Sequence, residues 1–349
     1  MIATTQSGLI RIRKTLSNLS SKWYMWLGLL VSGLCLFIAL RGLRLADVWM
    51  QLKTASYIWI VPGILVYFLA VWARTWRWHY LLRTTKIIPV RVMWTPVVIG
   101  YMGNNIFPFR AGEVLRAYVL KRKTGVVMGT GLATVVVERL FDGLVMLIFV
   151  LCGLPWVPNL PILLKQTVIL ASVVFLIALL VLFIWAINPE RVRALIVLVT
   201  DRFAPPEVGR RILAITDSFT AGLSSLRSAT GVTMVFMTSI VIWLLETVKY
   251  WFVMHAFSFT VTFFALMLMN GVVNLATTLP STPGYVGTFD APGIEILKIF
   301  GVAPAVAVSY TMILHAALWL PITLLGLWYM VKEGMSWQEF KQVAETKGQ

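Results

Sequence analysis

The sequence predicts an all-α, polytopic integral membrane protein with about seven to eight transmembrane helices and two re-entrant or broken-helix segments. Of its 349 residues, 59% are hydrophobic and only 13% are charged, whereas about 25% of the residues in an ordinary soluble protein are charged. Apolar runs of about 18 or more residues recur along nearly the whole chain, and each such run is long enough to be a membrane span. They leave no stretch of the size that a separate soluble catalytic domain needs.

Seven apolar runs can each cross a bilayer core, because a helix rises about 1.5 Å per residue and the core is about 30 Å thick. The first run exceeds a signal-peptide core and lacks the small residue of a lipoprotein cleavage site, so we expect a retained signal anchor. One transmembrane domain is predicted over 23–330, between a basic cytoplasmic N-terminus (1–22) and a short polar tail (331–349). The runs are 23–40, 57–78, 126–151, 168–187, 231–254, 262–279 and 302–330.

Two further apolar stretches, 92–108 and 278–299, are interrupted by glycine and proline. Such residues expose backbone polar groups, which at membrane depth are tolerated only where protein or a water-filled cavity satisfies them. Both stretches are therefore predicted to be re-entrant or broken helices. Each also places asparagine shortly before proline, with glycine following (104–113 and 274–284). Paired interrupted segments indicate a transporter's binding site; an internal repeat and a coincidence both remain open interpretations.

The net charge of +16 comes from basic residues beside the apolar runs, which favours contact with a membrane surface over nucleic-acid binding. The basic residues predict an inside N-terminus in the cytoplasmic (inner) membrane, whereas the number of crossings and the side of the C-terminus stay open. The longest polar segment, 188–230, has apolar residues at helical spacing and is predicted to form two amphipathic helices on the inner leaflet. Predicted inner segments 1–22, 74–91, 110–123 and 188–230 carry 4, 5, 5 and 6 Lys or Arg, and outer segments 41–56, 152–167 and 255–261 carry 3, 1 and none.

A group of polar residues around the first interruption is a candidate lipid head-group site. Arg110, Glu113 and Arg116 follow at successive spacings of three, so a helix would bring them to one face. A guanidinium at a membrane interface can hold a lipid phosphate through two hydrogen bonds, and Asn104 and Asn105 lie just upstream. A solvated amphipathic helix with internal ion pairs is the alternative.

Glu138, Arg139 and Asp142 lie inside an apolar run, where ionisable groups are costly and usually functional. Glu138 and Asp142 share a helix face at a spacing of four, so a nearby cation or a bound proton must relieve their repulsion. We expect an intramembrane charge or proton site here, with a structural ion-pair network as the alternative. Glu246 and Lys249, three residues apart on a later span, are interpreted as a structural pair unless they face a cavity.

The second interruption predicts a broken-helix hairpin. Pro283, Gly284 and Gly287 allow close backbone turns whose amides can receive an anionic head group, while Asp290 and Glu295 can receive an amine or a proton. Of these two carboxylates we favour Glu295. An ordinary loop with solvated acids is the alternative.

No catalytic, nucleotide-binding or metal-binding motif occurs, and the isolated histidines lack companion ligands. We therefore expect neither an enzyme nor a bound cofactor or metal.

Three ordered motifs carry a resemblance to a known family: NNIFPFRAGEVLRAYVL (104–120), VVVERLFDG (135–143) and TLPSTPGYVGTFDAPGIE (278–295). The chain resembles the lysylphosphatidylglycerol synthase transmembrane-region family, the flippase-like domain of multiple-peptide-resistance proteins, over roughly 20–335. The resemblance implies an all-helical lipid-handling domain whose cargo is an anionic, aminoacylated or polyprenyl-phosphate-linked lipid. Aminoacyl transfer in the full-length synthases resembles the work of a separate C-terminal domain, so we do not expect it of these residues.

Together these features predict membrane lipid translocation, with membrane lipids, mainly anionic ones, as the partners. One alternative is a non-transporting partner of envelope-lipid enzymes or glycosyltransferases. A weaker alternative is an integral-membrane lipid-modifying enzyme that uses the same carboxylates. The lipid, the direction, the energy source and the oligomeric state do not follow from the sequence.

Overall fold

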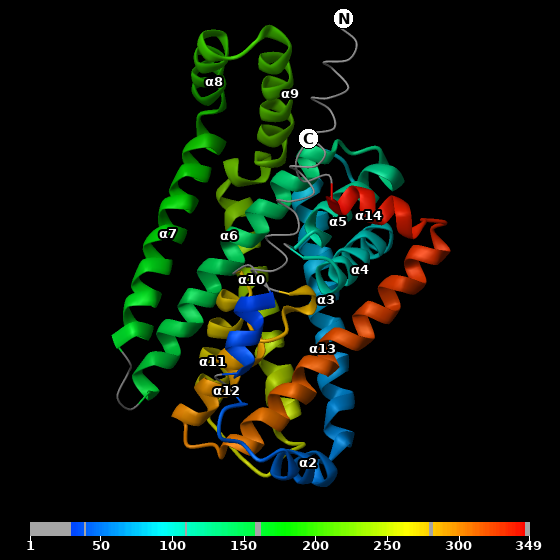
Figure 1. Ribbon diagram of the computed structural model, residues 1–349. Coiled ribbons are helices and arrows are strands. Elements are labelled where there is room, and N and C mark those ends of the chain that lie inside the picture. The colour runs from blue at the N-terminus through cyan, green and yellow to red at the C-terminus, as the bar shows by residue number, and fades with distance from the viewer. Residues whose placement is uncertain (1–28, 38–39, 109, 158–161, 279–281, 346–349) are drawn as a thin grey trace, which may run out of the picture.

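The computed structural model describes residues 29–37, 40–108, 110–157, 162–278 and 282–345 (Figure 1). Within these ranges the chain forms α-helices and short 3₁₀ helices and no strand, which confirms the predicted all-α class. The basic segment 1–22 and residues 23–28 and 38–39 of the first predicted span lie outside the described residues.

Five long helices form the body of the protein. Three segments, 57–82, Ala229–Met254 and Pro304–Lys332, are long and apolar enough to cross a membrane, and α7 with the helix after it makes a fourth if that bent pair is one span. The number of crossings predicted from the sequence therefore stays a prediction. The five helices are α3 (Ile60–Leu82), α6 (Met128–Gly153), α7 (Ile162–Ile187), α10 (Ala229–Met254) and α13 (Pro304–Lys332).

In the first interrupted stretch, 92–108, the broken-helix alternative is wrong, because the stretch is not broken internally, and the re-entrant alternative stays a prediction. One helix, α4 (Val90–Ile106), runs through it, and the chain turns only before α5 (Gly112–Thr124). The glycines serve close packing instead: a Cβ on Gly100 would lie 2.7 Å from the Arg116 Cβ, and one on Gly103 would lie 2.8 Å from the Gly112 Cα. Helices α4 and α5 therefore form a tight hairpin.

The second interrupted stretch is broken, as predicted. Helix α11 (Phe263–Ala276) has only 14 residues, about 21 Å of helix and less than the predicted span 262–279. A 3₁₀ turn, η4 (Pro283–Tyr285), then leads to α12 (Asp290–Ile299). In Figure 1 the α4–α5 and α11–α12 hairpins occupy opposite halves of the bundle.

Segment 188–230 contains the two predicted helices, α8 (Pro189–Phe203) and α9 (Pro206–Gly222). Helix α8 is turned 99° from α7. The α8–α9 pair stands at one end of the bundle, and α2 (Leu45–Thr54) lies at the opposite end (Figure 1).

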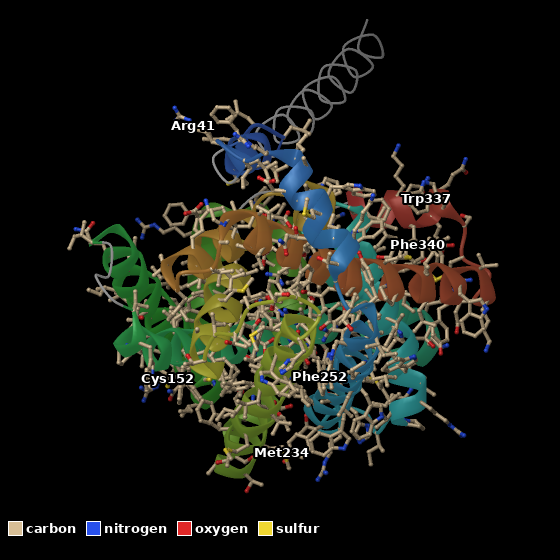
Figure 2. All side chains as sticks on the ribbon, turned by 90° about the horizontal axis from the view of Figure 1, so that it is seen from below. Arg41, Cys152, Met234, Phe252, Trp337 and Phe340 are labelled. Atoms are coloured by element: carbon tan, nitrogen blue, oxygen red, sulfur yellow. The ribbon has the colours of Figure 1, made fainter. Side chains whose placement is uncertain are left out.

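The predicted polar tail holds a further helix, α14 (Trp337–Glu345), drawn in red in Figure 2. Its Phe340 side chain is fully buried among residues of α4 and α5, and Trp337 stacks on Phe107 with ring centroids 5.4 Å apart. This amphipathic helix fastens the C-terminal residues to the first hairpin.

Candidate functional site

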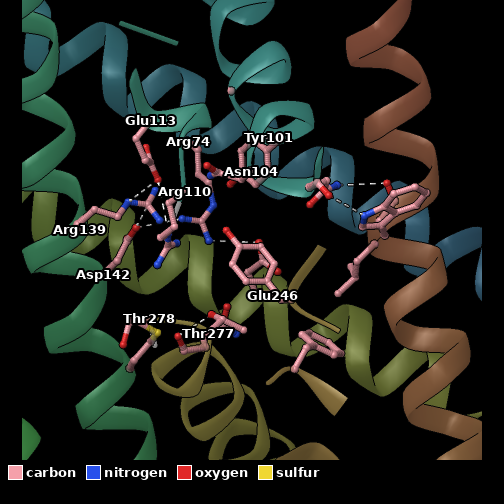
Figure 3. A pocket seen from close by; sticks show the side chains of 18 of the residues that line it. Arg74, Tyr101, Asn104, Arg110, Glu113, Arg139, Asp142, Glu246, Thr277 and Thr278 are labelled. Carbon is pink, nitrogen blue, oxygen red and sulfur yellow. Dashed lines mark hydrogen bonds and ion pairs between the residues drawn. The ribbon is translucent and has the colours of Figure 1, made fainter. Parts of the chain in front are cut away.

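A cavity of about 280 Å³ lies where the two hairpins approach each other inside the bundle (Figure 3). The first hairpin contributes Asn104 and Arg110 to its lining, and the second contributes Thr277, Thr278 and Tyr285. Both Arg110 (φ 53°) and Tyr285 (φ 60°) have left-handed backbone conformations. Non-glycine residues rarely adopt this strained conformation, and such strain concentrates at functional sites.

Two arginines of α3 are central to the site, although the sequence assigned them to an inner loop. That assignment is wrong, because α3 continues to Leu82 and buries Arg74 and Arg77 with 4% and 1% of their surface exposed. They recur three residues apart within an aromatic run, WARTWRW at 72–78. This spacing in apolar surroundings was the signal that could have identified them as buried.

The two carboxylates of α6 meet these arginines. Asp142 accepts hydrogen bonds from Arg77 Nη1 (2.6 Å), from Arg74 Nη1 (3.0 Å) and from the indole Nε1 of Trp243 (3.0 Å). Glu138 accepts from Arg77 Nε at 3.3 Å and also pairs with Arg116. Their predicted repulsion is therefore relieved by cations on other helices, in addition to Arg139, which reaches Asp142 at 3.5 Å.

The predicted head-group residues converge on Glu113. Its carboxylate lies 3.6 Å from Arg139, 3.9 Å from Arg116 and 4.0 Å from Arg110. Arg110 precedes α5 instead of belonging to it, so its left-handed backbone, and not a regular helix face, brings it to the other two.

The α10 pair faces the cavity and is more than a pair within one helix. Lys249 binds Glu246 as predicted, but Glu246 also accepts from Arg74 Nη2 at 3.2 Å, and both α10 residues line the cavity. The exception that the sequence analysis allowed, a pair that faces a cavity, therefore applies, and α3 supplies a third partner.

These ion pairs join ten side chains into one network, which we call the charge network. It contains six cations and four carboxylates, an excess of two positive charges. Its members are Arg74, Arg77, Arg110, Arg116, Arg139, Lys249, Glu113, Glu138, Asp142 and Glu246.

Aromatic rings cover part of this excess: Arg116 lies 4.0 Å from the Trp78 ring centroid, and Arg74 lies 4.9 Å from that of Trp243. Several polar atoms of the network remain buried without a hydrogen-bond partner, namely the Nε atoms of Arg74, Arg110, Arg116 and Arg139 and the neighbouring Oδ1 of Asn104. Unused guanidinium donors around a cavity suit an anion with several oxygens.

The second hairpin is held by Asp290, and not by the favoured Glu295. Asp290 is 7% exposed and accepts from the Gly287 N–H at 2.9 Å, with its other oxygen 2.8 Å from His315 Nδ1. Glu295 is half-exposed and pairs with Lys298. The structure therefore does not bring Glu295 to the cavity.

The His315 ring lies between two acceptors, because its Nε2 is 2.7 Å from the Gly284 carbonyl oxygen. The ring therefore links Asp290 at the start of α12 to the backbone at Gly284, and it ties α12 and α13 to this turn.

Asn105 and Gly284 also hold the hairpins against α13. The side-chain amide of Asn105 donates to Thr323 Oγ1 (2.8 Å), and the backbone carbonyl of Asn105 accepts from Trp319 Nε1 (3.3 Å). A Cβ on Gly284 would lie 2.8 Å from the same indole nitrogen. Pro283 begins the η4 turn.

No group of three or more His, Cys, Asp or Glu side chains that could hold a metal ion occurs within the described part of the chain. The polar groups of the cavity are mainly arginines with their carboxylate partners, together with Lys249, amides and hydroxyls.

Fold and site together define an integral membrane protein with a charged internal cavity between paired helical hairpins. Residues 25–326 match the model of the lysylphosphatidylglycerol synthase TM region, and the chain belongs to this family.

Curated relatives agree with this membership. A UPF0104 membrane protein of Methanothermobacter thermautotrophicus is 25% identical over 82% of this chain and 84% of its own length. The UPF0104 membrane protein MJ1595 of Methanocaldococcus jannaschii is 25% identical over 66% of this chain and 71% of its own length. Glycosyltransferase AglD of Haloferax volcanii is 27% identical over 63% of this chain but only 40% of its own length.

Proposed function

We propose that this protein translocates a phosphate-bearing lipid between the leaflets of the cytoplasmic membrane. The observation that carries the proposal is the excess of buried cations in the cavity where two hairpins from opposite halves of the bundle meet. Short helices that converge on a central site are the arrangement by which transporters expose one binding site to either side.

In this proposal the charge network has two parts. Arg77, Glu138 and Asp142 are at most 1% exposed and hold α3 to α6. Arg110 and Arg139 have about 30% of their side-chain surface exposed, reach Glu113 only beyond hydrogen-bond distance, and bind the lipid phosphate. The hairpin around Gly284 closes the opposite side, and the acyl or prenyl chains stay in the bilayer.

The test is leaflet accessibility of fluorescent lipids in proteoliposomes that contain the purified protein. Anionic, aminoacylated and prenyl-phosphate lipids are compared, and a membrane-impermeant quencher reports the outer leaflet. We expect protein-dependent movement of one class, reduced by about tenfold in Arg110→Gln, because a charge-assisted hydrogen bond is lost. Arg193→Gln is the matched control, because Arg193 pairs with Asp217 on the exposed α8–α9 surface, away from the cavity. Equal rates in empty and protein-containing vesicles, for a folded protein, refute translocation.

A second candidate is a non-transporting membrane partner of glycosylation enzymes. The similarity to a protein named glycosyltransferase AglD favours it. This candidate predicts no lipid movement in vesicles and a stable complex with an envelope glycosyltransferase on purification from the native membrane.

A further inference from the structure

We propose that the cavity selects a phosphomonoester head group, a terminal phosphate with two negative charges, over aminoacylated or diester head groups. The inference rests on the proposed function only in taking a lipid as the ligand. The charge network, its unused donors and the size of the cavity are three observations that specify this class.

The charge balance comes first. Among the charged residues that line the cavity itself, five cations face three carboxylates, again an excess of two. Buried charges without counterions are unfavourable, so the occupied site gains most from a ligand that supplies two negative charges. A phosphate monoester carries about −1.5 to −2 at pH 7. A phosphodiester carries one negative charge, and an added aminoacyl ammonium cancels it.

The donors agree with this assignment. Arg110, Arg116 and Arg139 surround Glu113. The Nε atoms of Arg110 and Arg139 lie 4.0 and 3.6 Å from Glu113 Oε1, beyond hydrogen-bond distance, and the Nε of Arg116 has no hydrogen-bond partner either. The aromatic rings beside Arg74 and Arg116 offset part of the positive charge of these arginines. They are not hydrogen-bond partners of the two Nε atoms. A monoester presents three terminal oxygens to such donors, and a diester presents two, so the arginines have more acceptors with the monoester.

The size of the cavity limits the group that is attached to the phosphate. At about 280 Å³ the cavity is near the lower end of small-molecule sites, which span about 300–1,000 Å³. It holds a phosphate and a small neighbouring group, with aromatic side chains such as Tyr101, Trp243 and Phe289 on its walls. A larger group such as an oligosaccharide would have to extend out of the cavity, whereas a lipid that ends in a bare phosphate places its phosphate and first carbons inside.

Binding to the purified full-length protein in detergent tests the proposal. The probes are short-chain lipids: a prenyl phosphate, a phosphatidic acid, a phosphatidylglycerol and a lysyl-phosphatidylglycerol. The first two share the monoester and differ in their source, so their comparison distinguishes a prenyl from a glycerol lipid. We expect both monoesters, or one of them, to bind at least about tenfold more tightly than the last two.

Two variants with opposite expected signs make the test sharp. Arg110→Gln removes one surplus cation and is expected to weaken monoester binding about tenfold. Glu113→Gln removes the carboxylate that competes for three arginines and is expected to strengthen it. Arg193→Gln, the control on the exposed surface, is expected to change neither affinity.

Tighter binding of lysyl-phosphatidylglycerol than of both monoesters overturns the inference, as does a shift in the same direction for Arg110→Gln and Glu113→Gln. Failure of the two proposals is distinguishable. Movement of an aminoacylated lipid in vesicles keeps translocation and refutes the head-group class. Selective monoester binding without movement keeps the head-group class and refutes translocation.

Discussion

Replacing Glu138 by Gln tests whether the charge network determines the stability of the bundle. The Glu138 side chain is inaccessible to solvent and pairs with Arg77 and Arg116 on two other helices. Without its charge, Arg77 keeps Asp142 and Ser239, but Arg116 keeps the weaker contacts with Glu113 at 3.9 Å and with the Trp78 ring. Removing one partner of a buried ion pair costs about 3–5 kcal/mol. Because Gln retains one acceptor oxygen, we expect a cost at the lower end, about 3 kcal/mol.

The measurement is the free energy of unfolding in mixed micelles titrated with a denaturing detergent. Glu295→Gln is the matched control, since Glu295 is half-exposed and its pair with Lys298 contributes at most about 1 kcal/mol. A cost for Glu138→Gln no larger than that of the control refutes the view that this network holds α3, α5 and α6 together.

Three further predictions concern the hairpins and α14. Asp290→Asn is expected to change the unfolding free energy by less than about 1 kcal/mol, because an amide can still accept from the Gly287 N–H and donate to a ring nitrogen of His315. Asp290→Ala loses both contacts and costs about 2–3 kcal/mol. Equal costs in the same titration contradict this. Gly112→Ala is expected to cost at least about 3 kcal/mol, since its Cβ would lie 1.9 Å from the Gly100 carbonyl oxygen, while Gly131→Ala, with 3.4 Å to its nearest neighbour, is neutral or stabilising. The hydrogen bond from Tyr118, with Arg122 nearby, holds the pKa of Glu339 below its usual value. Docking of α14 is therefore stabilised above about pH 4.3, the ordinary pKa of a glutamate. This contribution is lost as the pH falls through the lowered pKa. Hydrogen-exchange protection factors of α14 should fall on acidification in the wild type and not in Glu339→Gln.

Hydropathy alone predicted much of the fold, because long apolar runs have few alternatives to membrane helices. The α8 and α9 helices followed from helical spacing of apolar residues. The unbroken helix over 92–108 could not be predicted from spacing, because glycines that break a helix and glycines that allow a neighbouring helix to approach look alike in sequence. Only the partner decides, and here the partner is α5 at Gly112.

The site was predictable where its residues were sequence neighbours. Arg110, Glu113 and Asp142 were identified from motifs, and all three line the cavity. Arg74 was not, because its carboxylate partners lie 68 and 172 residues away in sequence. Long-range ion pairs leave no periodic signal, and a basic residue near the end of an apolar run resembles a flanking loop charge.

The charge network explains why a costly arrangement exists at the centre of the bundle. A network built only for stability would balance its charges, because every surplus buried cation is unfavourable. Asp142 on the α3–α6 side accepts close hydrogen bonds from Arg74 and Arg77, whereas three of the four arginines with an unpartnered Nε lie around Glu113, beside the first hairpin turn. The same turn holds Arg110 in a strained backbone conformation, and Tyr285 in the facing turn is strained as well. Uncompensated charge and backbone strain at the meeting point of two hairpins are what a binding site that must also move would require. Packing alone would require neither.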